Sequence, residues 1–248
     1  MTSTCIHIPI PQAPAVPAEP VQPDARLGAA LPLLRGGVMA DVGTDHAYLP
    51  IAALRQGLCD FAVATDIHRG PAEVAAAHLA ANGLSEKEAR VLLTDGLHGA
   101  WDYHPTDICI FGMGGEMIAR IIDEAPWVKD RSVRLILQPM TKQETLREYL
   151  AQNGFQTIRE QLVKTDRIYT VLCAEYDGQV RTLTPLERLM GRDNLERGDA
   201  LTQELAHRHV DVLSATREGK LKGVDPDTAR EDELLAALHQ YLKSITEE

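Results

Sequence analysis

Short hydrophobic runs and amphipathic stretches alternate along the middle of the chain. Runs such as Ile108–Phe111 hold four apolar residues in a row, as in strands that are buried on both faces. The stretches between the runs repeat apolar residues every three or four positions, as in helices. This alternation predicts a parallel sheet that is covered by helices on both faces. We expect its strands at residues 38–42, 61–66, 90–93, 107–111 and 134–137.

Two longer strand-like runs, 157–163 and 168–175, follow these units. Only residues 164–167 separate them, which is the spacing of a β-hairpin. They add an antiparallel pair to the sheet. The sequence therefore predicts a doubly wound, mostly parallel seven-stranded sheet of the Rossmann-like α/β class.

Both ends of the chain differ from this middle part. Residues 1–24 carry six prolines, and we expect them to form an extended, disordered arm. After residue 178, apolar residues return with helical spacing, which predicts one long helix from Thr184 to about Arg217 and a second that starts at Asp225 and Pro226. The expected parts are the arm at 1–24, a cofactor-binding domain at 25–178 and a coiled-coil-like helical hairpin at 179–248.

The stretch Val38–Pro50 joins the first strand to the first helix and carries the clearest chemical signal. Its apolar run reaches Asp41, and Gly43 follows where the chain must turn. In open α/β sheets, cofactors bind at the carboxyl ends of the strands. The stretch lacks the further glycines of a dinucleotide fingerprint, and an aspartate beside the turn would repel a pyrophosphate. S-Adenosylmethionine (SAM), which carries an ammonium and a sulfonium but no phosphate, fits better.

Acidic residues or glycines also stand at the ends of three further strands, and the ends of parallel strands meet at one edge of the sheet. Asp66 is placed to accept hydrogen bonds from a ribose diol, and Asp95 from an adenine amino group. The glycine-rich run 112–115 lets a flat group approach the backbone. Each feature alone also fits a plain turn, but their coincidence favours a nucleoside cofactor. The expected cofactor-binding residues are Asp41, Gly43, Asp66, Asp95, Gly96, Gly112, Met113 and Gly114.

Three places are candidates for contacts with the substrate. Asp45 and His46 form a candidate catalytic acid–base pair, although adjacent residues usually point apart and His46 equally fits a turn histidine bonded to backbone. Gln138 and Pro139 follow the fifth strand and either read the polar edge of a substrate or begin a loop. Tyr169 fits a packing residue of its strand or a platform for a base.

Composition narrows the class of protein. Hydrophobic residues make up 44% of the 248 and charged residues 25%, as in soluble globular proteins. The net charge of -11 argues against a large basic nucleic-acid surface but allows a local basic patch. The four cysteines lack metal-site spacing, and no apolar run is long enough to span a membrane. We expect a cytoplasmic monomer that binds neither a metal nor a membrane, with Cys109 and Cys173 as buried free thiols.

Several motifs together resemble one known family. The segments Asp41–Pro50, Asp95–Leu97, Gly112–Gly115 and Leu135–Pro139 are similar to those of the bacterial tRNA (adenine-N1)-methyltransferases that modify position 22, the TrmK family. The resemblance covers about residues 26–176 and implies a class I SAM-dependent methyltransferase whose C-terminal helices help to hold tRNA. Asp66 stands where that family often has glutamate. Basic residues for phosphate contacts would come from a subset of Arg26, Arg35, Arg167, Arg188, Arg192, Arg208, Lys220 and Lys222.

The resemblance implies transfer of the SAM methyl group to N1 of an unpaired or flipped adenine in tRNA. N1 has a lone pair, so the reaction needs no covalent enzyme intermediate and depends mainly on positioning. Asp45 is the candidate for stabilising the charge on the methylated base. Two alternatives stay open: a SAM-dependent methyltransferase that acts on a small molecule or a protein, and a non-catalytic SAM-binding interaction protein.

Overall fold

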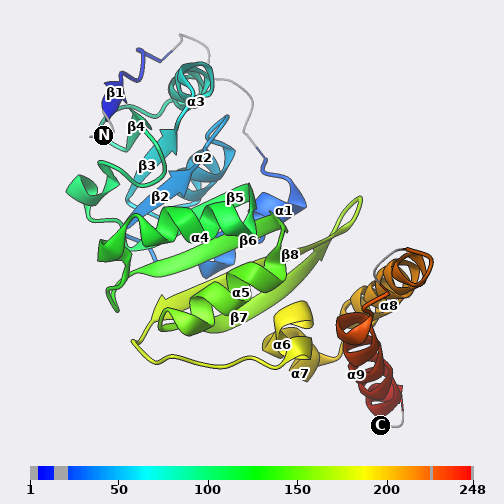
Figure 1. The fold of residues 1–248 in the computed structure, drawn as a ribbon. Coiled ribbons are helices and arrows are strands. Elements are labelled where there is room, and N and C mark those ends of the chain that lie inside the picture. The colour runs from blue at the N-terminus through cyan, green and yellow to red at the C-terminus, as the bar shows by residue number, and fades with distance from the viewer. Residues whose placement is uncertain (1–4, 14–21, 224–225, 247–248) are drawn as a thin grey trace.

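The computed structural model describes residues 5–13, 22–223 and 226–246. In this part of the chain a sheet of eight strands forms the centre, in the order β1-β4-β3-β2-β5-β6-β8-β7 (Figure 1). Strands β2 to β6 run parallel, and β1, β7 and β8 pair antiparallel with their neighbours. The strands are β1 (Ile6–Ile8), β2 (Val38–Val42), β3 (Phe61–Asp66), β4 (Ala89–Leu93), β5 (Asp107–Gly114), β6 (Arg134–Thr141), β7 (Phe155–Lys164) and β8 (Ile168–Tyr176).

Helices cover both faces of the sheet because the central strands are apolar on both sides. In β5, Cys109 packs into the core cluster of α2 and α3, whereas Ile108 and Ile110 pack into the cluster of α4 and α5 on the opposite face. The continuous apolar run of this strand therefore supplies two cores. The helices of this domain are α1 (Ala25–Gly28), α2 (Tyr48–Arg55), α3 (Arg69–Ala81), α4 (Gly115–Asp123) and α5 (Gln143–Gln152), with short 3-10 turns at Leu31–Leu33, Ala100–Tyr103 and Pro126–Val128.

The predicted doubly wound fold is confirmed, with one strand more than the seven expected. The eighth strand is β1, which comes from the arm that was predicted to be disordered. That prediction is wrong for residues 6–8: Ile6 and Ile8 alternate with His7, so one face of the segment can pack on the sheet, and Ile8 is buried. Residues 1–4 and 14–21 of the arm lie outside the described residues.

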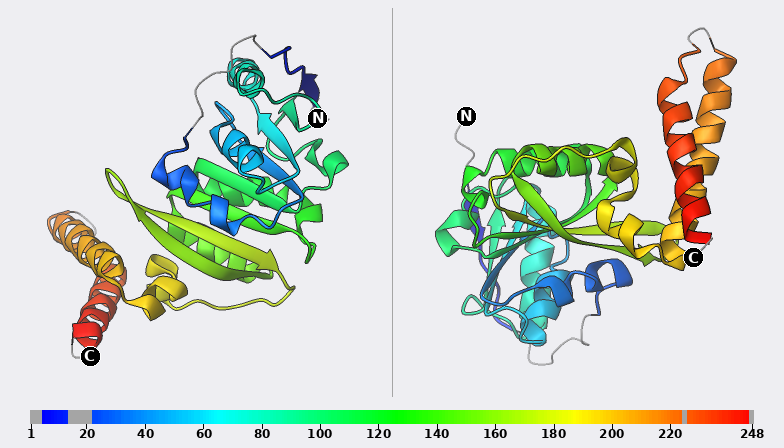
Figure 2. Two further views of the ribbon diagram at one scale, coloured as in Figure 1. Left: turned by 180° about the vertical axis from the view of Figure 1, so that it is seen from behind. Right: turned by 90° about the horizontal axis from the view of Figure 1, so that it is seen from below.

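The C-terminal part contains three helices where one long helix was predicted. Gly191 and Gly198 interrupt the helical pattern with φ angles of +83° and +56°, a left-handed backbone that an α-helix cannot contain. The predicted helical hairpin is present as α8 and α9, which stand away from the sheet (Figure 2). The predicted start of its second helix at Asp225 lies outside the described residues. The helices are α6 (Pro185–Met190), α7 (Arg192–Arg197), α8 (Ala200–Leu221) and α9 (Ala229–Thr246).

Two expectations from composition can be compared with the structure. Cys109 and Cys173 are buried free thiols, as predicted. Within the described ranges, no helix has the length and apolarity that a membrane span requires.

A buried ion pair joins the sheet domain to the helices that follow it. Arg147 Nε lies 2.8 Å from Glu160 Oε1, and both side chains are at most 3% exposed. Arg147 also donates to the backbone carbonyls of Arg188 and Leu189, and Asn194 donates to Glu160. Each partner is therefore needed to compensate the buried charge of the other.

We expect Glu160→Gln to lower the free energy of unfolding by about 2 kcal/mol, because glutamine keeps the volume but leaves Arg147 without its counter-charge. Urea unfolding followed by circular dichroism measures the change. Glu204→Gln is the matched control, since its pair with Lys164 is exposed and should be worth less than about 1 kcal/mol. Equal losses in the two variants would contradict the importance of the buried pair.

Candidate functional site

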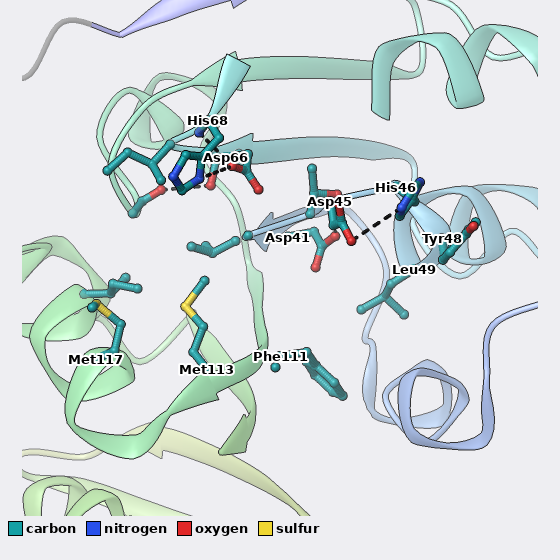
Figure 3. A pocket seen from close by; sticks show the side chains of 18 of the residues that line it. Asp41, Asp45, His46, Tyr48, Leu49, Asp66, His68, Phe111, Met113 and Met117 are labelled. Carbon is teal, nitrogen blue, oxygen red and sulfur yellow. Dashed lines mark hydrogen bonds and ion pairs between the residues drawn. The ribbon is translucent and has the colours of Figure 1, made fainter. Parts of the chain in front are cut away.

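A cavity of about 620 Å³ opens at the carboxyl ends of β2, β3, β4 and β5 (Figure 3). The sheet order puts these ends side by side, with β2 between β3 and β5. Ligands of open α/β sheets bind at this kind of edge. The predicted site residues that line the cavity are Asp41, Gly43, Asp45, His46, Asp66, Asp95, Gly96, Gly112 and Met113.

Asp41 lines the cavity and is buried. The residue is 5% exposed, and its Oδ2 accepts a hydrogen bond of 2.7 Å from the Thr44 hydroxyl. Burial raises the pKa of Asp41 to about 6, against the Thr44 hydrogen bond, and the Asp66 carboxylate adds to the rise. A cationic group bound here would relieve this unfavourable charge.

Gly43 makes the tight turn after β2 possible. Its φ is +72°, and its backbone N–H and that of Thr44 both donate to the Thr65 carbonyl, at 2.8 and 3.0 Å. A Cβ at this position would overlap the side-chain methyl group of Met113. The positive φ is the feature that calls for glycine here, because the Met113 methyl group is the end of a flexible side chain that can move aside.

Asp66 and Asp95 each carry partners that fix their carboxylates. Asp66 Oδ1 accepts the backbone N–H of His68 at 2.8 Å, and the residue is 8% exposed. Asp95 forms an ion pair with Arg120 of α4, with 3.2 Å between Nη2 and Oδ1. Both carboxylates accept hydrogen bonds, as the predicted contacts with hydroxyl and amino groups of a nucleoside require.

The glycine-rich end of β5 is held from behind by Gln138. The side-chain oxygen of Gln138 accepts the Gly112 N–H at 3.3 Å and a hydrogen bond of 2.7 Å from Arg26. Gly112 and Met113 line the cavity, whereas Gly114 caps α4 and is not among the lining residues. The side-chain-free backbone at Gly112 leaves one wall of the cavity flat.

Asp45 and His46 lie together at the cavity, as Figure 3 shows. Asp45 Oδ2 is 3.5 Å from His46 Nε2, and the Asp45 side chain is 68% exposed. The His46 ring stacks on Tyr48 and His78, with centroids 5.1 and 5.2 Å apart. The buried His46 Nδ1 has no hydrogen-bond partner among the described residues. The two adjacent side chains therefore do meet, in contrast to the usual behaviour of neighbours.

The other predicted substrate residues lie outside the cavity lining. Gln138 is fully buried, and its amide nitrogen donates to the Pro139 carbonyl at 3.0 Å. The ring of Tyr169 lies beside two guanidinium groups, 5.9 Å from Arg26 and 4.9 Å from Arg167. Gln138 is therefore linked to the cavity by its hydrogen bond with Gly112, and Tyr169 is linked to it by its contact with Arg26. Direct contact of these residues with a substrate stays a prediction.

Some residues of the cavity could not be recognised from the sequence alone. Arg120 lies on an ordinary helix, and only the fold brings it to Asp95. Met117, one turn earlier, also lines the cavity through packing alone. Thr44 could have been found, because a hydroxyl three residues after an aspartate at a turn is a common local hydrogen-bond pattern.

Carboxylates outnumber guanidinium groups among the charged residues that line the cavity. Such a cavity attracts a cation and repels a phosphate, and its acceptors and flat wall suit a nucleoside. The residues present therefore fit SAM, which combines an ammonium, a sulfonium, a ribose and an adenine. Among the described residues the charged lining consists of Asp24, Asp41, Asp45, Asp66 and Asp95 with Arg26 and Arg120.

Comparison with known proteins agrees with this chemistry. A Bacillus subtilis protein, tRNA (adenine(22)-N(1))-methyltransferase, is 36% identical over 151 residues, which are 58% of this chain. The match spans 63% of that relative, a little less than two thirds of its length. The resemblance stated from the sequence motifs is thereby confirmed.

Solved structures extend the likeness to nearly the full length of the neighbours. The B. subtilis m1A22 tRNA methyltransferase TrmK is 28% identical, with a TM-score of 0.75 over 92% of this chain and 98% of that one. A Streptococcus pneumoniae protein, described as a candidate m1A22 tRNA methyltransferase and solved with S-adenosyl-L-methionine, is 28% identical, with a TM-score of 0.76 over 88% and 98%. The methyltransferase domain family matches residues 24–172. The chain therefore belongs to the methyltransferase domain family.

Proposed function

We propose that this protein transfers the methyl group of SAM to N1 of the adenine at position 22 of tRNA. The observation that carries the proposal is the acidic, nucleoside-sized cavity at the carboxyl edge of the sheet. Support comes from the likeness to the m1A22 tRNA methyltransferase of B. subtilis, which includes almost all of that chain. A fold alone would not carry the proposal, because one fold serves many functions.

Three carboxylates are proposed to hold the cofactor. Asp41 is buried and charged, so it is suited to the ammonium group; Asp66 is suited to the ribose hydroxyls and Asp95 to the adenine amino group. When bound, SAM supplies a methyl group on a positively charged sulfur. The chain's own task is to orient the cofactor and the base so that the two reacting atoms meet in line.

Asp45 is proposed to act on the target base. Its carboxylate is exposed at the cavity, where it can face a base that has left its stack. Positive charge develops on the adenine ring during the reaction, and a fixed carboxylate nearby stabilises that charge. His46 packs against both Tyr48 and His78, which also stack on each other, so this ring cluster fixes His46 and holds Asp45 in place through their 3.5 Å contact.

A groove between the sheet domain and the helical hairpin is proposed to contact tRNA phosphates. Of the basic residues considered from the sequence, Arg167 and Arg208 both line this groove, between β8 and α8. Arg35, Arg188 and Arg192 are instead bound to carboxylates of the chain itself. A small number of well-placed arginines allows an acidic protein to bind a polyanion.

Transfer of labelled methyl from SAM to unmodified bulk tRNA tests the proposal, with the product nucleoside identified by chromatography and mass spectrometry. We expect 1-methyladenosine in a tRNA that has adenine at position 22 and none when this base is guanine. SAM binding without transfer to tRNA would favour another acceptor or a non-catalytic role. Absence of both SAM binding and methyl transfer would overturn the proposal that the cavity holds SAM.

We further infer that the protein works as a cytoplasmic monomer and without a metal ion. No cluster of three metal-ligating side chains occurs in the described ranges. Sedimentation measures the oligomeric state, and insensitivity of methyl transfer to EDTA would support metal-free catalysis.

A further inference from the structure

The N-terminal strand β1 lies at the edge of the sheet beside β4 (Figure 1). The two strands are antiparallel, with Ile6 opposite Leu93 and Ile8 opposite Val91. Ile8 is 6% exposed and belongs to the apolar cluster that also contains α3. Without β1, the backbone of β4 would form an open sheet edge. The strand is thus an integral part of the sheet, although the matched family domain begins only at residue 24.

Polar contacts fasten this segment to the turn that precedes β4. His7 Nε2 lies 3.1 Å from Glu86 Oε1. The same carboxylate accepts the backbone N–H of Ile10 at 3.4 Å. One glutamate therefore holds two residues of the N-terminal segment, one inside β1 and one just after it.

The strand that β1 pairs with leads directly into the cavity. β4 ends at Leu93, and the next three residues, Thr94, Asp95 and Gly96, line the cavity. The Thr94 N–H donates to the Asp66 carbonyl at 2.8 Å, which ties this loop to the neighbouring strand end. The position of β4 therefore determines where the cavity presents Asp95 and Gly96.

Cys5, just ahead of β1, lies against the same loop at Gly99. A Cβ on Gly99, whose φ is +77°, would collide with the Cys5 sulfur. Burial raises the pKa of the Cys5 thiol, and the nearby Thr94 hydroxyl opposes that rise. The loop 94–99 is thus in contact with the cavity through its first residues and with the N-terminal segment through its last.

We propose that residues 5–10 position the loop 94–99 for cofactor binding, so that the N-terminal segment is a working part of the SAM site. The inference rests on the proposed function, because it takes SAM as the ligand. If a ligand binds only those molecules in which the loop is ordered, its apparent Kd rises as the fraction of such molecules falls. Release of β1 should therefore weaken cofactor binding even though no residue of the cavity has changed.

The substitution Ile8→Asp in the full chain tests this proposal, because a carboxylate in this buried position disfavours docking of β1. We expect S-adenosylhomocysteine to bind about tenfold more weakly in calorimetry. Hydrogen exchange should become faster in peptides that cover residues 94–99. Ile8→Val should behave like the unaltered chain. Phe155→Leu, a buried change in β7 at the opposite edge of the sheet, should lower the melting temperature and leave the Kd unchanged.

If Ile8→Asp does not fold, Ile8→Ala weakens docking of the same strand without placing a charge in the core, because it removes the buried apolar contacts of this side chain. Fast exchange at residues 5–10 together with an unchanged Kd would overturn the inference. So would an equal loss of affinity in Phe155→Leu. Failure of the unaltered chain to bind S-adenosylhomocysteine would instead overturn the proposed function, and the two failures are therefore distinguishable.

Discussion

Replacing Asp41 by asparagine is expected to weaken binding of S-adenosylhomocysteine about a hundredfold or more, while the ligand-free protein becomes more stable. Asp41 is 5% exposed, so an ammonium beside it meets a full negative charge in surroundings with little water. Asparagine keeps the shape and still accepts the Thr44 hydroxyl, but it carries no charge. The loss of affinity therefore measures the contribution of the charge.

The gain in stability has the same cause. Burial raises the pKa of Asp41 from 3.8 to about 6, so the folded state prefers the protonated carboxyl. Protonated Asp41 therefore stabilises the folded state relative to the unfolded state. This stabilisation is complete below about pH 4 and is lost as the pH rises through about 6. At pH 8 the buried charge costs on the order of 3 kcal/mol, and asparagine removes this cost.

Calorimetry at pH 8 and pH 5 and urea unfolding at pH 8 measure both effects. In the unaltered protein, affinity should fall as the pH drops below about 6, because a protonated Asp41 no longer attracts the ammonium. In Asp41→Asn this part of the pH dependence should disappear. An unchanged Kd at pH 8, or a variant less stable than the parent, would contradict the role of the buried charge.

The sheet and its helices could be predicted from the sequence because their signals are local. The run Ile108–Phe111 marks a strand buried on both faces, and the structure places it at the centre of the sheet. The strand β1 was missed because three residues among prolines give too short a signal, and only the edge of β4 gives them a partner. The prediction of a single helix after Thr184 was wrong because the chain turns out of the helical conformation at Gly191 and Gly198, although the spacing of the leucines is helical.

The candidate site was predictable where it depends on strand ends and less so where it depends on helices. Asp41 and Asp66 follow apolar runs, so their meeting at one edge follows from the parallel sheet. Arg120 comes from the outer layer, and its contact with Asp95 depends on how α4 packs. The sequence also gave no sign that Gln138 would turn inward and support Gly112.

Replacing Asp45 by asparagine is expected to lower kcat for methyl transfer about a hundredfold to a thousandfold, the usual range for removal of one group that stabilises transition-state charge. The Asp45 backbone has a φ of +45°, a left-handed conformation that asparagine and aspartate tolerate better than other side chains. The turn should therefore keep its shape. Because Asp45 is 68% exposed and is not among the residues proposed to hold the cofactor, the Kd of S-adenosylhomocysteine should stay within about twofold.

A matched control separates this local effect from the overall charge of the protein. Asp60 precedes β3 at the amino end of the strand, away from the cavity, and Asp60→Asn removes the same charge. If a general change in attraction for tRNA were responsible, both variants would alter KM and neither would alter kcat. A loss confined to kcat in Asp45→Asn would place the carboxylate at the developing charge of the base. An unchanged kcat would assign Asp45 to the turn alone and leave His46 as the remaining predicted catalytic residue at the cavity.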